Sequence, residues 1–229
     1  MSKVKWLSAD LDVSARQLAR LLQQAQFTKD SEEGFVVDRA RRNSIEARYV
    51  QRVNVTEVIV DPFGNEAEFS SVKYSEQHFF IADDLPCIEL RQGVRHLHAC
   101  LALLSQTTDF RIAVKPVKVD VNHWLEVFAA STSMPFTVDA FQVGSIAFSD
   151  GASARALVKA GRGDAQTALK SLTSARPYVI EKVRVKHQRV DHRGTVVLAS
   201  SGTASTTGFS IEEDTHVLEA LRNSLSVSI

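Results

Sequence analysis

The sequence predicts an α+β fold with largely antiparallel sheets, long β-hairpins and flanking amphipathic helices. Segments with the three-to-four-residue spacing of one-sided helices are separated by runs in which apolar and polar residues alternate, as in half-buried strands. Short turn clusters join these runs, and no strand-helix-strand unit repeats, which disfavours a Rossmann-like parallel sheet. The 229 residues suffice for one large or two small domains.

The first half of the chain predicts a helix, a long hairpin and a second helix. Leucines 18, 21 and 22 recur at helical spacing, and the run rich in Val, Ile, Tyr and Thr that follows is typical of strands. The expected elements are a helix over 13–22 capped by Asp10 or Asp12, a hairpin of strands 45–60 and 66–81 around the turn 61–65, and a helix over 92–106.

The second half predicts shorter helices between two further hairpins. The expected elements are a strand over 110–115, a short helix capped by Asp120, a hairpin of strands 141–148 and 154–159, a helix from Asp164 to Ala175, a hairpin of strands 178–190 and 195–199, and a closing helix over 215–225. Two subdomains follow: an N-terminal one over 1–109 that carries the long hairpin, and a C-terminal one over 110–229 that carries a basic strand.

Composition narrows the function classes without choosing among them. The 27 basic and 27 acidic side chains cancel, so net charge favours neither nucleic acid nor acidic substrates. The charge is nevertheless segregated: residues 53–90 carry a local −7, and residues 155–193 a local +7. The sequence has two cysteines and no apolar run long enough to span a bilayer, so we expect a soluble cytoplasmic protein with reduced thiols.

The basic strand over 178–190 is the sharpest functional signal. Alternation places Lys182, Arg184 and Lys186 on one face, about 6.7 Å apart, and the valines at 179, 183 and 185 on the other. This spacing suits contacts with successive phosphates of a nucleic-acid backbone. Five neighbouring cations could widen the row into a patch: Arg155, Lys159, Arg162, Arg189 and Arg193. Alternatively, these cations are ordinary solvent-facing residues, or they neutralise the acidic hairpin of this chain or of a partner.

Other chemistries are poorly supported. Gly161-Arg162-Gly163-Asp164 lacks the third glycine of a dinucleotide loop and the Lys-Ser/Thr of a P-loop. His96, His98 and Cys100 would diverge on the expected helix, so we expect no metal site. The Ser70-x-x-Lys73 pattern of serine β-lactamases falls in an expected strand rather than at a helix start. We therefore expect no cofactor, and we favour a binding protein over an enzyme.

One acidic cluster leaves enzymatic activity as a third hypothesis for the function. Asp61, Glu66 and Glu68 stand near Lys73 around the tip of the first hairpin. A solvated acidic face is the simpler interpretation, because the sequence lacks the Asp/Glu-x-Lys tripeptide of two-carboxylate nucleases.

The stretch from about residue 122 to 209 resembles the bacterial recombination-associated protein RdgC family. The shared features are an aromatic short helix at Asn122-His123-Trp124-Leu125, the segment 141–156, the helix after Asp164 and the hydrophobic and basic strand from Tyr178. The resemblance implies a non-enzymatic α+β protein that dimerises around duplex DNA, with Lys182, Arg184 and Lys186 as phosphate contacts. The hairpin over 45–81 has no obvious counterpart in that family.

The favoured hypothesis is a non-enzymatic protein that binds nucleic acid, with duplex DNA preferred, independently of base sequence. Few aromatic residues interleave with the basic positions, which favours backbone contact over stacking on single strands. Such a protein could act in recombination or DNA maintenance, as an oligomer or with a partner protein. The alternative is a protein-binding subunit of a larger cytosolic assembly, held by the complementary acidic and basic segments.

Overall fold

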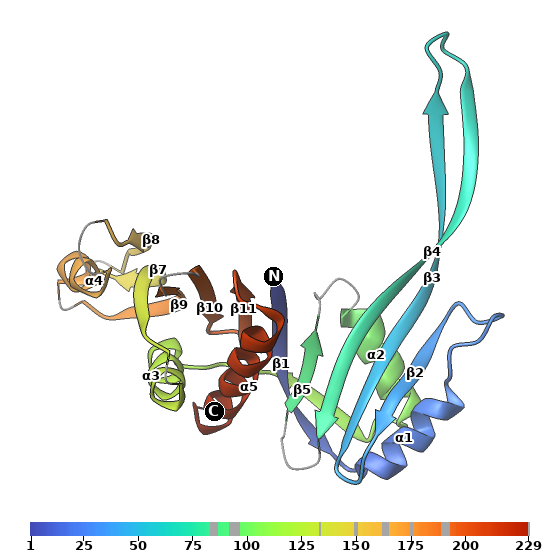
Figure 1. Cartoon of the computed structure of the whole chain (residues 1–229), viewed down its shortest axis with the longest axis horizontal. Coiled ribbons are helices and arrows are strands. Elements are labelled where there is room, and N and C mark those ends of the chain that lie inside the picture. Colours follow the sequence, from blue (N-terminus) through green and yellow to red (C-terminus); the bar gives the residue numbers. More distant parts are fainter. Residues whose placement is uncertain are drawn as a thin grey trace. The chain divides into compact units, whose positions relative to one another are not determined.

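The structure is a computed structural model that describes residues 1–82, 87–91, 97–132, 134–148, 151–161, 165–174, 176–188 and 193–228 (Figure 1). The chain forms two compact units. The hairpin unit is Ser8–Lys115, and the C-terminal unit combines Met1–Leu7 with Pro116–Ile229. Strand β1, Ser2–Leu11, thus contributes its first part to one unit and its last part to the other. Antiparallel pairing dominates in both units, which confirms the predicted α+β class.

The hairpin unit is built around β3, Ser44–Val60, and β4, Glu66–Ala82. Their pairing runs without a register shift from Ser44 opposite Ala82 to Val60 opposite Glu66, which confirms the predicted long hairpin. The strand order is β2-β3-β4-β5-β1, and β6 also pairs with β1. The other elements of this unit are α1 (Ala15–Gln24), β2 (Glu33–Ala40), β5 (Cys87–Arg91), α2 (Leu97–Thr107) and β6 (Ile112–Pro116).

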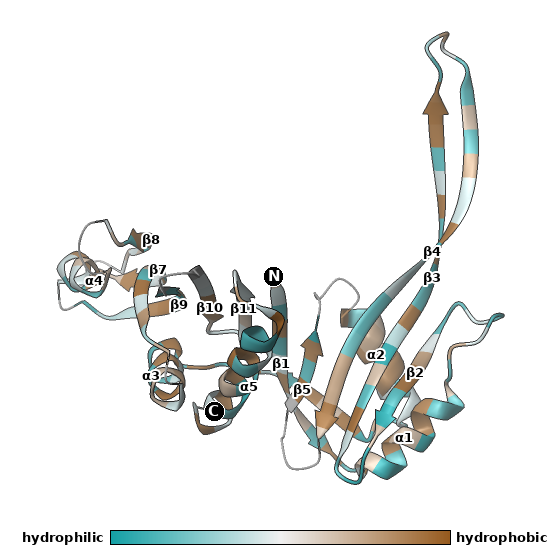
Figure 2. Ribbon diagram, in the orientation of Figure 1, coloured by the Kyte–Doolittle hydropathy of each residue, from teal (hydrophilic) through white to brown (hydrophobic). Residues whose placement is uncertain are grey.

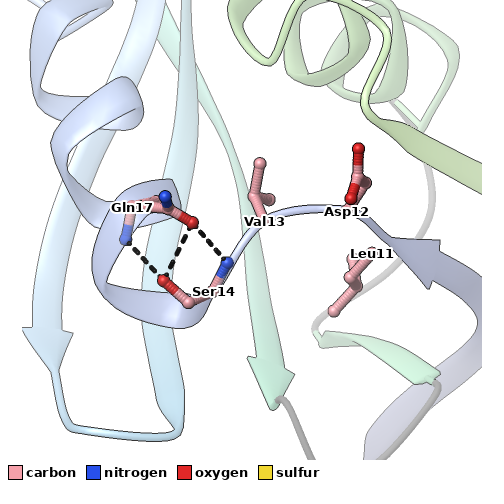
Figure 3. A pocket seen from close by; sticks show the side chains of 5 residues that line it. All are labelled: Leu11, Asp12, Val13, Ser14 and Gln17. Atoms are coloured by element: carbon pink, nitrogen blue, oxygen red, sulfur yellow. Dashed lines mark hydrogen bonds between the residues drawn. The ribbon is translucent and has the colours of Figure 1, made fainter.

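Helix α1 begins with a capping box. The Gln17 backbone N–H donates to Ser14 Oγ at 3.3 Å, and the Ser14 backbone N–H donates to Gln17 Oε1 at 3.0 Å (Figure 3). The expected cap at Asp10 or Asp12 is wrong: Asp10 lies in β1, Asp12 lies in the bend that follows, and Ser14 directly precedes the first helical residue.

The core of the hairpin unit covers only one end of the long hairpin. Phe35 of β2 packs edge to face against Tyr49 of β3 and Phe79 of β4, with ring centroids 6.1 and 5.9 Å apart. Burial, together with a hydrogen bond to Glu33, raises the pKa of the Tyr49 phenol. Beyond Val53 the side chains of β3 are mostly exposed, so the far half of the hairpin lacks such a core.

The C-terminal unit is a sheet with strand order β1-β11-β10-β9-β7-β8. Its helices lie beside this sheet, and α3 packs along α5 (Figure 1). The elements that follow β1 in this unit are α3 (Val121–Ser131), β7 (Phe136–Ala147), β8 (Ser153–Lys159), α4 (Ala165–Thr173), β9 (Tyr178–Gln188), β10 (Arg193–Ala199), β11 (Thr203–Thr207) and α5 (Ile211–Ser228). Asp120 accepts hydrogen bonds from the first turn of α3, as predicted.

Trp124 of α3 joins the helices to the sheet. Its ring packs edge to face on Trp6 of β1 at 5.8 Å between centroids, and its Nε1–H donates to Leu221 O and Ser224 Oγ of α5. Both tryptophans are fully buried. Because Trp6, Val4 and Ser2 share one face of β1, this packing assigns the helices to that face. The opposite face of the sheet carries Lys3 and Lys5.

Several strands are not predicted by the sequence analysis: β1, β2, β5 and β11. In β11 the buried positions are Ala204 and Thr206, and Thr206 donates a hydrogen bond to Asp214 of α5. Small and hydroxylated residues fit there because the helix lies close, and they leave no apolar alternation to detect. The expected strand over 110–115 begins instead at Ile112, since Phe110 is exposed and has a left-handed φ of 58°.

No helix in the described ranges combines the length and the apolar character needed to cross a membrane.

Gly34 of β2 lies directly against the Phe27 backbone. A methyl group there would stand 2.6 Å from Phe27 N, which is held in place because its N–H donates to Phe35 O at 2.9 Å. We predict that Gly34→Ala lowers the free energy of unfolding by about 1–3 kcal/mol in urea denaturation. Gly161→Ala is the matched control, because nothing lies within 4 Å of its added methyl group. Equal stability of the two variants would contradict this close approach.

Candidate nucleic-acid interface

The predicted basic strand is β9, which lies between β10 and β7. Its alternation is as predicted from Lys182 onward: Lys182 and Lys186 are exposed and Arg184 is half-buried. Val183 and Val185 between them are fully buried. The three cations therefore project from one face of the sheet, and the valines face the helices.

The predicted inward position of Val179 is wrong. Val179 is 59% exposed, whereas Ile180 is buried. Lys182 pairs with Gln142 of β7, but the next paired residue of β9 is Ile180, so Glu181 is an extra residue in a β-bulge. A bulge reverses the alternation on its far side, which no period-two pattern can anticipate.

The strand registers align the cations of several strands. Residues paired across an antiparallel sheet point to the same face. One lateral row crosses the whole sheet of the C-terminal unit: Lys3, Ser205, Val197, Arg184, Ala140 and Lys159. The next row is Lys5, Thr203, Ala199, Lys182, Gln142 and Leu157, and a shorter third row is Thr207, Thr195, Lys186 and Thr137. These rows, with Arg155 of β8, form what we call the open face.

Lys3 and Lys5 belong to the open face but were missed by the sequence reasoning. They reach it because β1 pairs with β11 at the edge of the sheet, more than 190 positions away along the chain. A signal was present, since Lys3, Val4, Lys5 and Trp6 alternate between polar and apolar residues.

Asp139 binds two of the predicted phosphate contacts, Arg184 and Lys186. Ala140 pairs with Arg184 and Val138 with Val185, so Asp139 is a bulge residue of β7 that is aimed at the open face. Its carboxylate binds Lys186 Nζ at 2.5 Å and also binds the Arg184 guanidinium. Burial alone would raise the pKa of Asp139, but the hydrogen bonds and charges of Lys186 and Arg184 outweigh it and lower that pKa.

Glu181, the bulge residue of β9, is the corresponding counter-charge for Arg155 of β8. Its carboxylate accepts a hydrogen bond from Gln142 Nε2 at 2.9 Å, and Arg155 Nη2 lies 3.9 Å from it. Arg155 Nε also donates to Gly144 O at 3.1 Å, so this guanidinium is held over the bulged strands although 81% of its side chain is exposed.

The open face is strongly basic. Among the described residues it carries seven cations and two carboxylates, a local net charge of +5. The cations are Lys3, Lys5, Arg155, Lys159, Lys182, Arg184 and Lys186. Within the described chain, no salt bridge involves Lys3, Lys5, Lys159 or Lys182. The structure thus brings together five of the predicted contacts and adds two.

The remaining predicted contacts cannot be placed on this face. Arg162 and Arg189 lie outside the described residues, and Arg193 is described only as the first residue of β10. The Gly-rich segment beginning at Gly161 likewise continues into residues that the structure does not describe.

The described residues give no supporting geometry for a metal site, a cysteine nucleophile or an acidic catalytic cluster. In the described ranges, no group of three or more metal-ligating side chains converges. Burial raises the pKa of the Cys100 thiol to about 12, so this cysteine is a poor nucleophile. Asp61 accepts hydrogen bonds from the Phe63 and Asn65 backbone and from Asn65 Nδ2, and these bonds lower its pKa and define the hairpin turn. Lys73 is paired with Glu57 at 2.9 Å.

A shallow depression of about 300 Å³ lies beside the start of α1 and is lined by Leu11, Asp12, Val13, Ser14 and Gln17 (Figure 3). The polar side chains of Ser14 and Gln17 bind each other in the capping box. The remaining polar side chain of the lining is Asp12, and a single carboxylate does not define a ligand site.

No protein-family model matches the chain, and no curated protein matches it. The resemblance of residues 122–209 to the RdgC family therefore stays a prediction.

Asp139→Asn tests the electrostatic role of the bulge. We predict a free energy of unfolding about 1 kcal/mol lower at neutral pH, a modest loss because 41% of Arg184 and 46% of Lys186 are exposed. The folded pKa of Asp139 is lowered, so its contribution is complete above the unfolded value of about 3.9 and disappears as pH falls through the folded value.

Urea denaturation at a series of pH values from neutral to acid measures this difference. Asp10→Asn is the control, because Asp10 binds Lys115 at 2.8 Å but both side chains are more than 60% exposed. A variant as stable as the wild type at neutral pH, or a difference that persists at low pH, would contradict the assignment.

Proposed function

We propose that the open face of the C-terminal unit binds nucleic acid through its phosphate backbone, with duplex DNA as the preferred ligand and no base-sequence readout. The observation that supports this function best is the lateral row from Lys3 to Lys159, which crosses every strand of that sheet. Cations from both edges and the centre of the sheet thus share one surface, as a sequence-independent backbone binder requires.

The dimensions of the row suit a charged polymer. Neighbouring strands lie about 4.8 Å apart, so Lys3 and Arg184 are separated by roughly 14 Å, and Arg184 and Lys159 by roughly 10 Å. Along β9 the cations repeat every ~6.7 Å. A face of this width can reach phosphates on both sides of a DNA groove, which is about 12 Å wide on the major side and 6 Å on the minor side.

The side chains between the cations support backbone contact. Hydroxyl groups occupy much of the open face, on Thr137, Thr195, Thr203, Ser205 and Thr207. Serine and threonine hydroxyls commonly bind phosphate oxygens alongside Lys and Arg. The outward positions of the described rows include no aromatic residue, so base stacking of the kind used by single-strand binders gains no platform.

Six of the seven cations divide into two classes, and the seventh, Lys5, is half-buried. Arg184 and Lys186 are oriented by Asp139, and Arg155 is placed near Glu181. Lys3, Lys159 and Lys182 are exposed and can bind phosphate without first breaking an ion pair. We therefore assign the larger part of the affinity to these three lysines and a positioning role to the paired cations.

The recombination or DNA-maintenance context of this proposal rests on the resemblance to the RdgC family alone. The alternative, a protein-binding subunit of a larger assembly, is favoured by a different feature: the uncovered far half of the β3–β4 hairpin. The two functions involve different surfaces and do not compete as explanations.

Binding to a random duplex across a salt series tests the proposal. We predict that affinity falls steeply with salt and that Lys3→Gln, Lys159→Gln and Lys182→Gln together reduce the slope of log K against log salt by about 3, since each lost phosphate contact removes roughly 0.9. The matched control replaces three exposed cations outside the open face, Arg16, Arg20 and Lys170, by Gln. The proposal fails if the wild type is not retained at low salt, or if both triple variants lose affinity equally.

A further inference from the structure

The positive charge of the open face is concentrated in two of its three rows. Five of its seven cations lie in the first and second rows, which we call the basic strip: Lys3, Lys5, Lys159, Lys182 and Arg184. The strip crosses every strand from β1 to β8, roughly 24 Å, and its two rows lie about 6.7 Å apart. The long direction of the strip therefore runs across the strands of the C-terminal unit and not along β9.

An ion pair borders the basic strip on each side. Beyond the first row, Lys186 Nζ lies 2.5 Å from the carboxylate of Asp139, which also binds Arg184 of the strip. Beyond the second row, Arg155 Nη2 lies 3.9 Å from Glu181 Oε1. Each bordering cation is thus matched by one carboxylate, so the local net charge of +5 equals the charge of the five strip cations.

The two carboxylates have fixed positions in the sheet. Asp139 and Glu181 are bulge residues, and hydrophilic positions like theirs interrupt the hydrophobic ones along β7 and β9 (Figure 2). The Asp139 side chain is 11% exposed and is held between two cations. Gln142 Nε2 donates to Glu181 at 2.9 Å, and a methyl group on Gly144 would stand 2.3 Å from Glu181 Oε1. Gly144 thus leaves the space that the Glu181 carboxylate occupies.

A phosphate backbone could follow either of two paths over this face. One path follows β9 over the cations at 182, 184 and 186, and it leaves the strip beside Asp139 at one end and beside Glu181 at the other. The second path follows the basic strip and passes between the two carboxylates, which lie roughly 10 Å apart along the strands. A carboxylate repels phosphate, and salt screens this repulsion little at short range. The carboxylates therefore disfavour the path along β9.

We propose that Asp139 and Glu181 determine how nucleic acid lies on the open face: they confine the phosphate backbone to the basic strip, so that it crosses the strands. This inference rests on the proposed nucleic-acid binding and adds the direction of the ligand and the residues that set it. Lys3 and Lys159, at the two ends of the strip, contact phosphate. Lys186 does not, although the sequence predicts it as a phosphate contact along β9.

Single substitutions, measured on a random duplex across a salt series, test the direction. Lys3→Gln and Lys159→Gln should each reduce the slope of log K against log salt by about 0.9, because each removes a phosphate contact. Lys186→Gln should leave that slope unchanged. A comparable loss for Lys186→Gln would overturn the proposal, and so would an unchanged slope for Lys3→Gln and Lys159→Gln.

A matched pair of introduced carboxylates tests the border of the strip independently of the lysines. Ser205 and Thr207 lie on the same face of β11, Ser205 in the first row and Thr207 in the third. Ser205→Glu should weaken duplex binding by about tenfold or more, whereas Thr207→Glu should weaken it by less than about threefold. Equal effects of the two variants would contradict a backbone that is confined to the strip.

Removal of both carboxylates tests their role directly. In a chain with Asp139→Asn and Glu181→Gln, the path along β9 is no longer opposed, so a further Lys186→Gln substitution should now reduce the slope by about 0.9. No effect of Lys186→Gln in that chain would show that the carboxylates do not direct the ligand. A wild type that is not retained at low salt would refute the binding itself, whereas a retained wild type that depends on Lys186 would refute the direction alone.

Discussion

The packing of Trp124 against Trp6 and α5 determines which face of the C-terminal sheet is buried. Because side chains of a strand alternate between faces, a residue fixed inward on β1 places its neighbours Lys3 and Lys5 outward. The continuous registers then extend this choice to β11, β10, β9, β7 and β8. The basic surface therefore depends on a hydrophobic contact on the opposite side of the sheet.

The two bulges modify this simple rule where the charge is highest. Asp139 and Glu181 are extra residues in β7 and β9, and each carboxylate is turned toward cations of the open face. Without them, seven cations would face each other across a few strand spacings with no internal counter-charge, at a cost in like-charge repulsion. The bulges thus stabilise the folded sheet while leaving the exposed lysines unpaired within the described chain.

The sequence predicted the fold class, the long hairpin and the outward row of β9, because these follow from local periodicity. It could not predict the inward turn of Ile180, since a bulge depends on the partner strand. Lys3 and Lys5 were missed because their neighbours in the sheet are about 200 residues away. Ser14 was overlooked as a helix cap although Gln17 follows at the spacing of a capping box.

The neutral whole-chain charge conceals two regions of opposite sign, +5 on the open face and −3 on residues 53–73, the far half of the β3–β4 hairpin. Their interactions differ in kind. Phosphate binding releases counterions and weakens steeply with salt, whereas strand pairing rests on backbone hydrogen bonds and apolar contacts that salt screens little. Salt therefore separates the two kinds of interaction: moderate salt weakens phosphate binding and leaves any strand pairing at the hairpin largely unchanged. The basic face attracts a polyanion and the acidic hairpin repels it, so charge directs a nucleic acid to the open face and away from the hairpin.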